Sequence, residues 1–327
     1  MRPTIAIVER LPGHSEDMGG FAALGQELGY DTHLYSERND RFHLIDYFRS
    51  RFSFPPDHIH DWAEITDPGI AFDVILLNTS FVWLDYMPQL MQWNTSKRLI
   101  VVHHHPEDAE LSPFGTALYL TPAAGMEKWI FPLYSKPQIP QELPGKGGPP
   151  LSRTPAELPT LTCIGTFEGK DITGARDYMD AGGRLVHYDR HRCHDFPDRE
   201  GLYTQHQGLE GLPFMAALCG QSPPIFLWLP IVFPSDYMVC RFTAALITGV
   251  DMNCVMVMPE RLRALYGFPE AAVIAYGESI TEPVCLEKLR DPLPAQYQRR
   301  RQLQTWAADR WEKNLQVFRA ALGLGKE

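Results

Sequence analysis

The chain has 327 residues, of which 44% are hydrophobic and 21% are charged. That length suits two domains of ordinary size, and the composition is typical of a soluble globular protein. A formal net charge of −10 argues against a broad nucleic-acid-binding surface, and no apolar stretch approaches the roughly 18 residues that span a membrane. The six cysteines are widely spaced and form no C-x-x-C pair, so we expect a reducing, cytoplasmic setting.

The first half of the chain alternates strand and helix patterns. Its first apolar run, Ile5 to Val8, is too short for a secretory leader and predicts a strand. Val74 to Leu77 are continuously apolar, as in a strand buried on both faces. The patterns predict strands at 4–9, 31–37, 72–80, 98–104 and 128–135, with helices at 21–30 and 83–93. Residues 135–159 contain seven prolines and three glycines, which predicts a linker between two domains.

The alternation restarts after this linker. The patterns predict strands at 160–167, 184–190, 224–233, 253–259 and 271–278, with helices at 172–183, 211–221, 239–250, 260–268 and 297–325. Strands that alternate with helices imply parallel βαβ units, so we predict an α/β chain of two Rossmann-like halves with a cleft between them. Ligands bind such sheets beyond the carboxyl ends of the strands. The stretch 101–114, VVHHHPEDAELSPF, is therefore predicted to line the cleft.

Three segments carry motifs beyond the alternation of strands and helices. Residues 163–171, CIGTFEGKD, lead from a strand into a glycine-containing loop with a basic residue, and residues 241–268 place a small-residue helix before a glycine and a strand. Residues 18–31, MGGFAALGQELGYD, follow the first strand. In these three segments the chain resembles GT-B glycosyltransferases, and the resemblance covers nearly the whole chain. It implies an α/β fold of two Rossmann-like domains that face each other across a cleft, with a C-terminal helix that crosses back.

The same resemblance implies a glycosyltransferase that moves a sugar from a nucleoside-diphosphate sugar to a glycan or small-molecule acceptor. The implied domains are an acceptor-binding domain (1–140), a linker (141–158), a donor-binding domain (159–300) and a helix that braces the first domain (301–327). Many retaining members carry two Glu residues spaced E-x7-E around the small-residue helix, whereas Thr243 stands where the second would fall. Retention and inversion of the sugar configuration both stay open.

Residues expected to bind the donor follow the strands of the second half. Lys170 is the predicted phosphate partner, because its loop follows a strand and the nearby Gly165 and Thr166 permit close backbone approach. Arg241 and Thr243 open a helix whose N-terminal amides favour a diphosphate. The loop after the strand at 271–278 suits either ribose binding or a cap on the next helix. The predicted donor-binding residues are Gly165, Thr166, Lys170, Arg241, Thr243, Tyr276, Ser279, Thr281 and Glu282.

An inverting transfer needs a base that takes the proton of the acceptor hydroxyl, and the ordinary pKa of histidine, about 6.5, suits that role. His14 and the histidines at 103–105 follow strands of the first half, with Glu16, Asp17, Glu107 and Asp108 as carboxylate alternatives. We predict that His14, His104 and Glu107 are catalytic. The predicted acceptor-binding residues are Gly19, Gly20, His103 and Asp108.

A metal site is the alternative interpretation of these histidines. Adjacent side chains of an extended segment point to opposite faces, so three consecutive histidines do not all bind one ion. His103 and His105 could do so with Glu107. A second set consists of His187, His191, Cys193 and His194, but its spacing fits no closed zinc template. We therefore expect no metal requirement and no cofactor beyond the donor substrate.

Two rival functions stay open. One is a metal-dependent hydrolase built on residues 103–108, and the other is a non-catalytic two-domain sensor of sugars or nucleotides. The expected partners are a nucleotide-sugar donor and a glycan or small-molecule acceptor, without nucleic acid or a membrane span. The sequence leaves the oligomeric state open.

Overall fold

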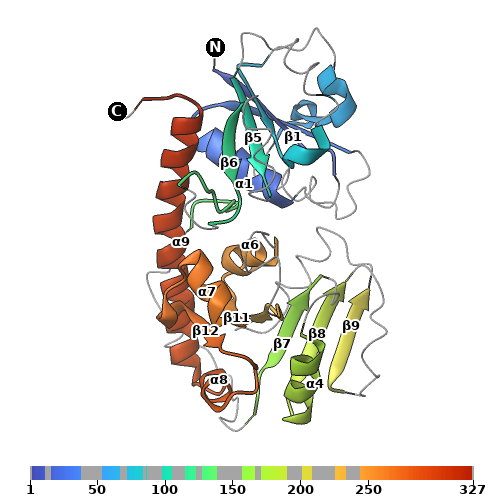
Figure 1. The fold of residues 1–327 in the computed structure, drawn as a ribbon, viewed down its shortest axis with the longest axis vertical. Coiled ribbons are helices and arrows are strands. Elements are labelled where there is room, and N and C mark those ends of the chain that lie inside the picture. The colour runs from blue at the N-terminus through green and yellow to red at the C-terminus, as the bar shows by residue number, and fades with distance from the viewer. Residues whose placement is uncertain are drawn as a thin grey trace.

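The computed structural model describes residues 2–11, 16–37, 54–66, 72–83, 86, 98–104, 115–122, 127–137, 157–165, 171–189, 201–207, 225–232 and 244–325. Within these ranges the chain forms two parallel sheets of six strands, one in each half. Figure 1 shows the two sheets in separate domains, with helix α9 (Leu293–Ala321) alongside both.

The N-terminal sheet has the strand order β3-β2-β1-β4-β5-β6, and every neighbouring pair is parallel. Its strands are β1 (Thr4–Val8), β2 (Asp31–Ser36), β3 (Ile59–Asp61), β4 (Val74–Leu77), β5 (Arg98–His103) and β6 (Thr116–Tyr119). Because alternate side chains of β1 point to opposite faces, Ile5 and Ile7 enter one hydrophobic core while Ala6 and Val8 enter another. The sheet is therefore buried on both faces, as its apolar runs predict.

Different segments cover those two faces. Helix α1 (Glu16–Glu27) follows β1, and its Phe21 and Leu24 join the core that contains Ile5. Ile65 and Trp83 lie in the other core. They belong to two of the short 3-10 turns of this domain, which are η2 (Pro56–His58), η3 (Trp62–Thr66) and η4 (Ser80–Trp83).

The C-terminal sheet has the strand order β12-β11-β10-β7-β8-β9 and is also parallel throughout. Its strands are β7 (Thr160–Ile164), β8 (Arg184–Asp189), β9 (Tyr203–Gln207), β10 (Phe226–Trp228), β11 (Val255–Pro259) and β12 (Val273–Tyr276). Besides α9, the other described elements of this half are α4 (Ile172–Asp180), α6 (Ala244–Asp251), α7 (Glu260–Tyr266), η7 (Glu270–Ala272) and α8 (Pro283–Leu289). Asp171 caps α4 by accepting a 2.7 Å hydrogen bond from the Gly174 N–H.

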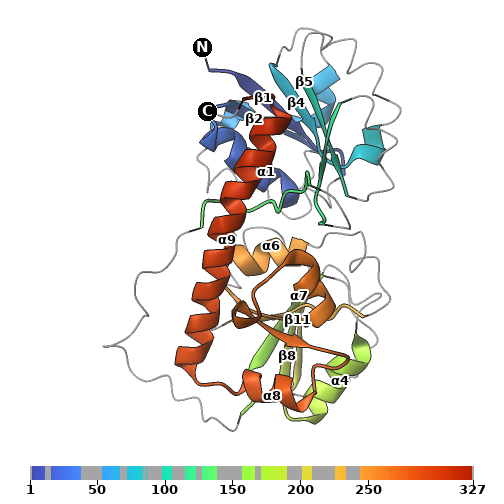
Figure 2. The ribbon, with the colours of Figure 1, turned by 60° about the vertical axis from the view of Figure 1, so that its left-hand side comes forward.

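Helix α9 joins the two domains. It packs against α6 and β11 of the C-terminal domain and against α1 and β6 of the N-terminal domain. Figure 2 shows the helix beside both domains after the molecule is turned. Its Leu303, Ala307, Trp311 and Phe318 recur at helical spacing and are all buried. The predicted amphipathic helix that crosses back to the first domain is thus confirmed. None of the described helices is both long and apolar enough to cross a lipid bilayer.

The structure corrects the prediction for the last strand of the N-terminal sheet. That strand is β6 rather than residues 128–135, which meet it only through an isolated bridge between Tyr119 and Trp129. The segment is continuously apolar because it lies between the domains, where the Phe131 ring packs edge-on against Tyr266 and Phe268. An apolar run alone does not distinguish a sheet strand from an extended segment between domains.

Besides β6 and the 3-10 turns, three described elements have no counterpart in the sequence prediction. Strands β3 and β9 are short or polar, and α8 has only seven residues, so none of them carries a clear periodic pattern. The helix predicted at 211–221 falls outside the described residues, and the one predicted at 83–93 falls mostly outside them. So does most of the predicted linker, residues 138–156.

Candidate active site

Polar side chains gather where the central strands of the N-terminal sheet end. Glu9 follows β1, Asn78 and Thr79 follow β4, and His104 follows β5. These strands are parallel neighbours, so their carboxyl ends lie along the same edge of the sheet. Glu9, Asn78 and Thr79 are fully buried, and His104 is only 8% exposed. A buried group of titratable side chains at this edge is a candidate site for chemistry.

Glu9 is enclosed by hydrogen-bond donors. Its Oε1 accepts a 2.6 Å bond from the Leu11 N–H, and its Oε2 accepts bonds of 2.7 Å from Asn78 Nδ2 and 2.6 Å from Thr79 Oγ1. Burial raises the pKa of Glu9 to about 8, although these hydrogen bonds oppose the rise. The raised pKa favours the neutral carboxylic acid over the carboxylate at Glu9.

Thr79 links Glu9 to His104. Its Oγ1 lies 2.6 Å from Glu9 Oε2 and 3.1 Å from His104 Nε2. Its backbone φ is +58°, a left-handed conformation that β-branched residues rarely adopt and that concentrates at functional sites. Because a hydroxyl both donates and accepts, Thr79 couples the protonation of Glu9 to the tautomer of His104.

Asp17, in the first turn of α1, faces the same histidine. Its Oδ2 lies 3.6 Å from His104 Nε2, and the two side chains are only 5% and 10% exposed. A carboxylate beside Nε2 favours the tautomer that carries its proton there, which places the basic lone pair on Nδ1. A histidine oriented by a carboxylate in this way is suited to act as a general base.

The His104–Asp17 pair lies where the two domains meet. Burial raises the pKa of the Tyr266 hydroxyl on α7, and the negative charge of nearby Asp17 raises it further. Met18, which follows Asp17, shares one hydrophobic core with Tyr266 and Phe268 of the C-terminal domain. Asp17, on α1 of the N-terminal domain, is thus close to α7 of the C-terminal domain.

Of the residues predicted to bind the acceptor, His103, Gly19 and Gly20 are described by the structure. The side chain of His103 is buried and stacks on Tyr119 of β6, with 5.2 Å between ring centroids. His103 thus packs between neighbouring strands of the sheet. Gly19 and Gly20 are buried in α1. A Cβ atom at Gly20 would lie 2.4 Å from the backbone of Pro132. Gly20 therefore makes room for the segment 127–137, and its contact with a sugar stays a prediction. The remaining candidates lie outside the described residues, namely His14, the side chain of Glu16, His105, Glu107 and Asp108.

In the C-terminal domain, Gly165 immediately follows β7 with a φ of +80°, a conformation that favours glycine. Its carbonyl accepts a 2.7 Å hydrogen bond from His187 Nε2, while His187 Nδ1 lies 3.0 Å from the Tyr203 hydroxyl. Both ring nitrogens of His187 thus have partners within the C-terminal domain, and they hold the turn after β7. The remaining predictions of this region lie outside the described residues, namely Thr166, Lys170, His191, Cys193, His194, Arg241 and Thr243.

Tyr276, at the end of β12, does not fit its predicted role. Its side chain is buried at 4% exposure, and its hydroxyl accepts a 3.0 Å hydrogen bond from Trp228 Nε1. The hydroxyl also lies 3.4 Å from the Leu229 carbonyl oxygen, to which it donates. Because these partners are in the core of the C-terminal domain, we do not retain Tyr276 as a nucleotide contact.

The Glu282 carboxylate binds backbone amides of the loop that follows β12. Glu282 accepts hydrogen bonds of 3.0, 2.6 and 3.1 Å from the backbone N–H groups of Gly277, Glu278 and Ser279. These bonds, led by the one from Gly277, lower the pKa of Glu282. The Ser279 and Thr281 hydroxyl oxygens lie 2.8 Å apart. Glu282 immediately precedes α8, but its side chain makes no capping hydrogen bond to that helix. The carboxylate instead binds three amides of the loop, and the predicted donor contacts of Ser279, Thr281 and Glu282 stay predictions.

Glu9, Asn78 and Thr79 were not among the predicted site residues, although a signal for them exists. Each follows an apolar strand run directly, in TIAIVE and VILLNT, and ligands bind at such ends in parallel sheets. The proximity of Asp17 to His104 has no comparable signal in the sequence.

No protein-family model and no curated protein sequence matches this chain. Solved structures do match it over their full length. HepE from Anabaena, in complex with UDP and glucose, has a TM-score of 0.61 at 9% identity and covers 98% of this chain and 99% of its own. AviGT4, a glycosyltransferase involved in avilamycin A biosynthesis, has a TM-score of 0.59 at 12% identity, with 99% of each chain covered. A putative UDP-N-acetylglucosamine 2-epimerase from Listeria monocytogenes has a TM-score of 0.51 at 9% identity, with 98% of this chain and 95% of its own covered.

The chain therefore has the GT-B fold, with two Rossmann-like α/β domains and a C-terminal helix that returns to the first domain. The predicted fold class is confirmed. At these identities the likeness is one of architecture.

Proposed function

We propose that the protein is a glycosyltransferase that moves a sugar from a nucleoside-diphosphate sugar to a hydroxyl group of a glycan or small-molecule acceptor. In this proposal His104 is the general base and Asp17 orients it. The observation that carries the proposal is the position of His104, 3.6 Å from Asp17 and 3.1 Å from Thr79, at the edge of the N-terminal sheet. In a GT-B enzyme that edge is where an acceptor hydroxyl would meet a donor held by the other domain.

The fold supports the same class of reaction. HepE was crystallised with UDP and glucose, and AviGT4 is described as a glycosyltransferase. Both structures match nearly all of this chain, so both domains and the returning helix have counterparts in proteins of that kind. This likeness supports a nucleoside-diphosphate sugar as the donor class. The nucleobase and the sugar of the donor are to be determined by experiment.

The chemistry is a single displacement. His104 Nδ1 takes the proton of the acceptor hydroxyl, whose oxygen attacks the anomeric carbon of the donor sugar. The bond between that carbon and the diphosphate oxygen breaks, and the nucleoside diphosphate leaves with the electron pair. The Asp17 carboxylate stabilises the imidazolium that forms, and a positioned base typically accelerates such a step about 10²–10⁴-fold. One displacement inverts the configuration at the anomeric carbon.

The donor would be held by the C-terminal domain. A leaving diphosphate needs fixed positive charge and N–H groups around it. Lys170 and Arg241 are the proposed partners on sequence grounds, and Gly165, with its left-handed backbone, stands at the start of the loop that leads to Lys170. A glycine at that position lets a phosphate approach the backbone closely.

The experiment begins with the donor. Thermal shifts with UDP, GDP and CMP identify the nucleotide, and its release from the matching sugar donor then measures turnover with a panel of acceptors. We expect His104→Gln to lower kcat at least about 100-fold while the nucleotide-induced shift stays unchanged. Lys170→Ala should instead reduce that shift. His206→Ala, at an exposed position of β9, is the matched control and should retain both.

Four results would contradict the proposal. Full turnover in His104→Gln would remove His104 as the base, and a product that keeps the donor's anomeric configuration would exclude the single displacement. Conversion of the donor sugar to its epimer without any acceptor would indicate epimerase chemistry instead. Binding of a nucleotide sugar without turnover for any acceptor would favour the sensor alternative.

A further inference from the structure

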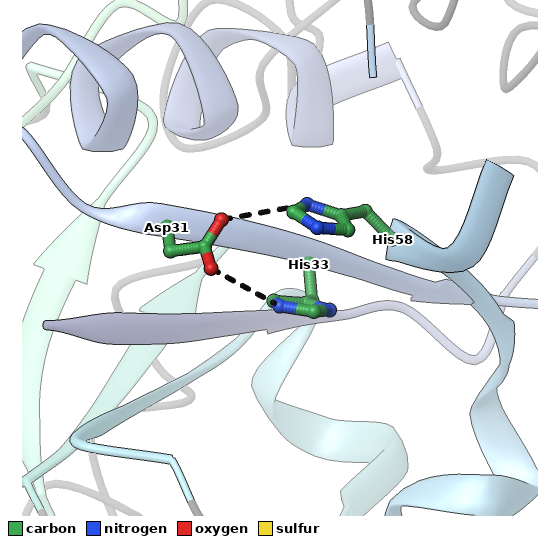
Figure 3. A group of neighbouring side chains, drawn as sticks. All are labelled: Asp31, His33 and His58. Atoms are coloured by element: carbon green, nitrogen blue, oxygen red, sulfur yellow. Dashed lines mark ion pairs between the residues drawn. The ribbon is translucent and has the colours of Figure 1, made fainter. Parts of the chain in front are cut away.

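A separate group of potential metal ligands lies at the opposite end of the N-terminal sheet. Asp31 is the first residue of β2, His33 follows two residues later, and His58 immediately precedes β3. Figure 3 shows the Asp31 carboxylate facing both imidazole rings. One ligand atom from each of the three residues lies within 4.8 Å of the other two.

Strand pairing brings these residues together. In the β2–β3 pair, Leu34 is aligned with Ile59, so the preceding residues His33 and His58 are neighbours. Their rings stack with 4.1 Å between centroids and an interplanar angle of 16°. Because side chains alternate along a strand, Asp31 lies on the same face of the sheet as His33.

We propose that Asp31, His33 and His58 form a binding site for a borderline divalent cation such as Zn²⁺. The Asp31 oxygens lie 3.5 Å from His58 Nδ1 and 4.0 Å from His33 Nε2. Two ligands at about 2.0–2.1 Å from a tetrahedral zinc ion are about 3.4 Å apart. The His58 separation is close to this value, whereas the His33 separation has to shorten by about 0.6 Å through small side-chain rotations when the ion binds. Imidazole nitrogens with a carboxylate suit zinc better than calcium or magnesium. Three protein ligands leave the fourth position to water.

A second layer of side chains is already in place to orient one ligand. His33 Nδ1 lies 3.1 Å from His60 Nε2, and His60 Nδ1 lies 3.5 Å from Glu64 Oε2. When His33 Nε2 binds a cation, its proton resides on Nδ1 and is donated to His60 Nε2. The remaining His60 proton then points to Glu64. Metal-binding histidines generally have such a partner on the other ring nitrogen.

The three side chains are accessible to an ion. The side chains of His33 and His58 are 18% and 19% exposed, and Asp31 is 44% exposed, so an ion can enter from solvent. His58 Nδ1 lies 3.2 Å from the Thr32 carbonyl oxygen. A cation at Nδ1 replaces that contact.

A cation here would join β2 to β3, the three-residue strand at the edge of the sheet. The group lies at the amino end of β2, whereas His104 follows the carboxyl end of β5. The site is therefore independent of the proposed glycosyl transfer.

The test uses Co²⁺ as a visible spectroscopic probe of a zinc site. The protein is treated with EDTA, freed of the chelator and titrated with Co²⁺, and Zn²⁺ is then added in competition. We expect a saturable absorption band of a low-coordinate Co²⁺ site that Zn²⁺ abolishes. Asp31→Asn and His58→Ala should each weaken Co²⁺ binding at least tenfold, whereas His206→Ala should bind as the wild type does.

Two outcomes would overturn the proposal. The first is a wild-type protein without a saturable band, and the second is equal affinity in the wild type and in Asp31→Asn. If His58→Ala fails to fold, the Co²⁺ affinity of Asp31→Asn tests the site by itself, because asparagine keeps the size of the side chain while removing the charge. Circular dichroism of each variant confirms that its fold is retained.

Discussion

Asn314 of α9 forms hydrogen bonds with both backbone polar groups of Phe131. Its Oδ1 accepts a 3.2 Å bond from the Phe131 N–H, and its Nδ2 donates a 2.6 Å bond to the Phe131 carbonyl. One side chain thus ties the C-terminal helix to the segment that follows the last strand of the N-terminal sheet. Arg310, one turn earlier, donates to the Trp129 carbonyl and places its guanidinium 3.5 Å from the Trp129 ring centroid.

We expect Asn314→Ala to lower the free energy of unfolding by about 2–4 kcal/mol. The change removes three hydrogen bonds in a buried region, namely the two with Phe131 and a 3.0 Å bond that Oδ1 accepts from Arg310 Nε. A typical intramolecular hydrogen bond contributes about 0.5–1.5 kcal/mol. Urea denaturation followed by circular dichroism measures the loss. Lys313→Ala, at the exposed neighbouring position, should stay within about 0.5 kcal/mol of the wild type. Equal effects of the two substitutions would show that the Phe131 contact contributes little.

We expect Gly20→Ala to destabilise the protein, although this exchange inside a helix ordinarily stabilises by about 0.5–1 kcal/mol. The new Cβ would meet the Pro132 backbone at 2.4 Å, and overpacking of this kind typically costs about 1–3 kcal/mol. Thermal unfolding gives the sign directly. Gln26→Ala, at an exposed position of the same helix, is the control. A Gly20→Ala protein that melts at or above the wild-type temperature would contradict the tight contact between α1 and Pro132.

Glu9→Gln should become progressively more stable relative to the wild type as the pH rises. The pKa of Glu9 is raised from 4.5 to about 8, so the folded state holds this proton more tightly than the unfolded state does. The stability linked to the proton is complete below about pH 4.5 and is lost as the pH rises towards 8, at no more than about 1.4 kcal/mol per pH unit. Glutamine mimics the neutral acid and does not titrate.

The measurement is the free energy of unfolding in urea at pH 5, 6, 7 and 8 for both proteins. The difference between their free energies of unfolding isolates the contribution of Glu9 titration, because the other titrating groups are common to the two chains. A difference that is constant over this range would show that Glu9 has an ordinary pKa in the folded protein.

Replacing Thr79 should test the link between Glu9 and His104. Thr79→Val keeps the shape of the side chain and removes the hydroxyl that contacts both residues, so we expect turnover to fall about tenfold or more, as for the loss of one hydrogen bond. Thr79→Ser keeps the hydroxyl and should stay close to the wild type. Nucleotide release with the identified donor and acceptor is the assay. Equal rates in the valine and serine variants would remove Thr79 from the proposed proton network.

Local pattern in the sequence was enough for the main elements. Runs such as Ile5 to Val8 and Val74 to Leu77 predict strands buried on both faces, and their alternation with helices predicts two parallel sheets. The recurrence of Leu303, Ala307 and Trp311 predicts α9. His104 was predicted because it follows one of these strands, and parallel sheets bind ligands at that end. Each inference depends only on residues that are close together in the chain.

Contacts between distant residues were decided by the tertiary structure. No local pattern places Asp17 beside His104, brings Pro132 against Gly20 or buries Tyr276 against Trp228. The grouping of Asp31, His33 and His58 likewise requires that β3 pair with β2 in one particular register. Backbone geometry imposes the strand and helix periods on the sequence locally. The order and register of the strands follow instead from the packing of the whole chain, and these determine which polar side chains meet.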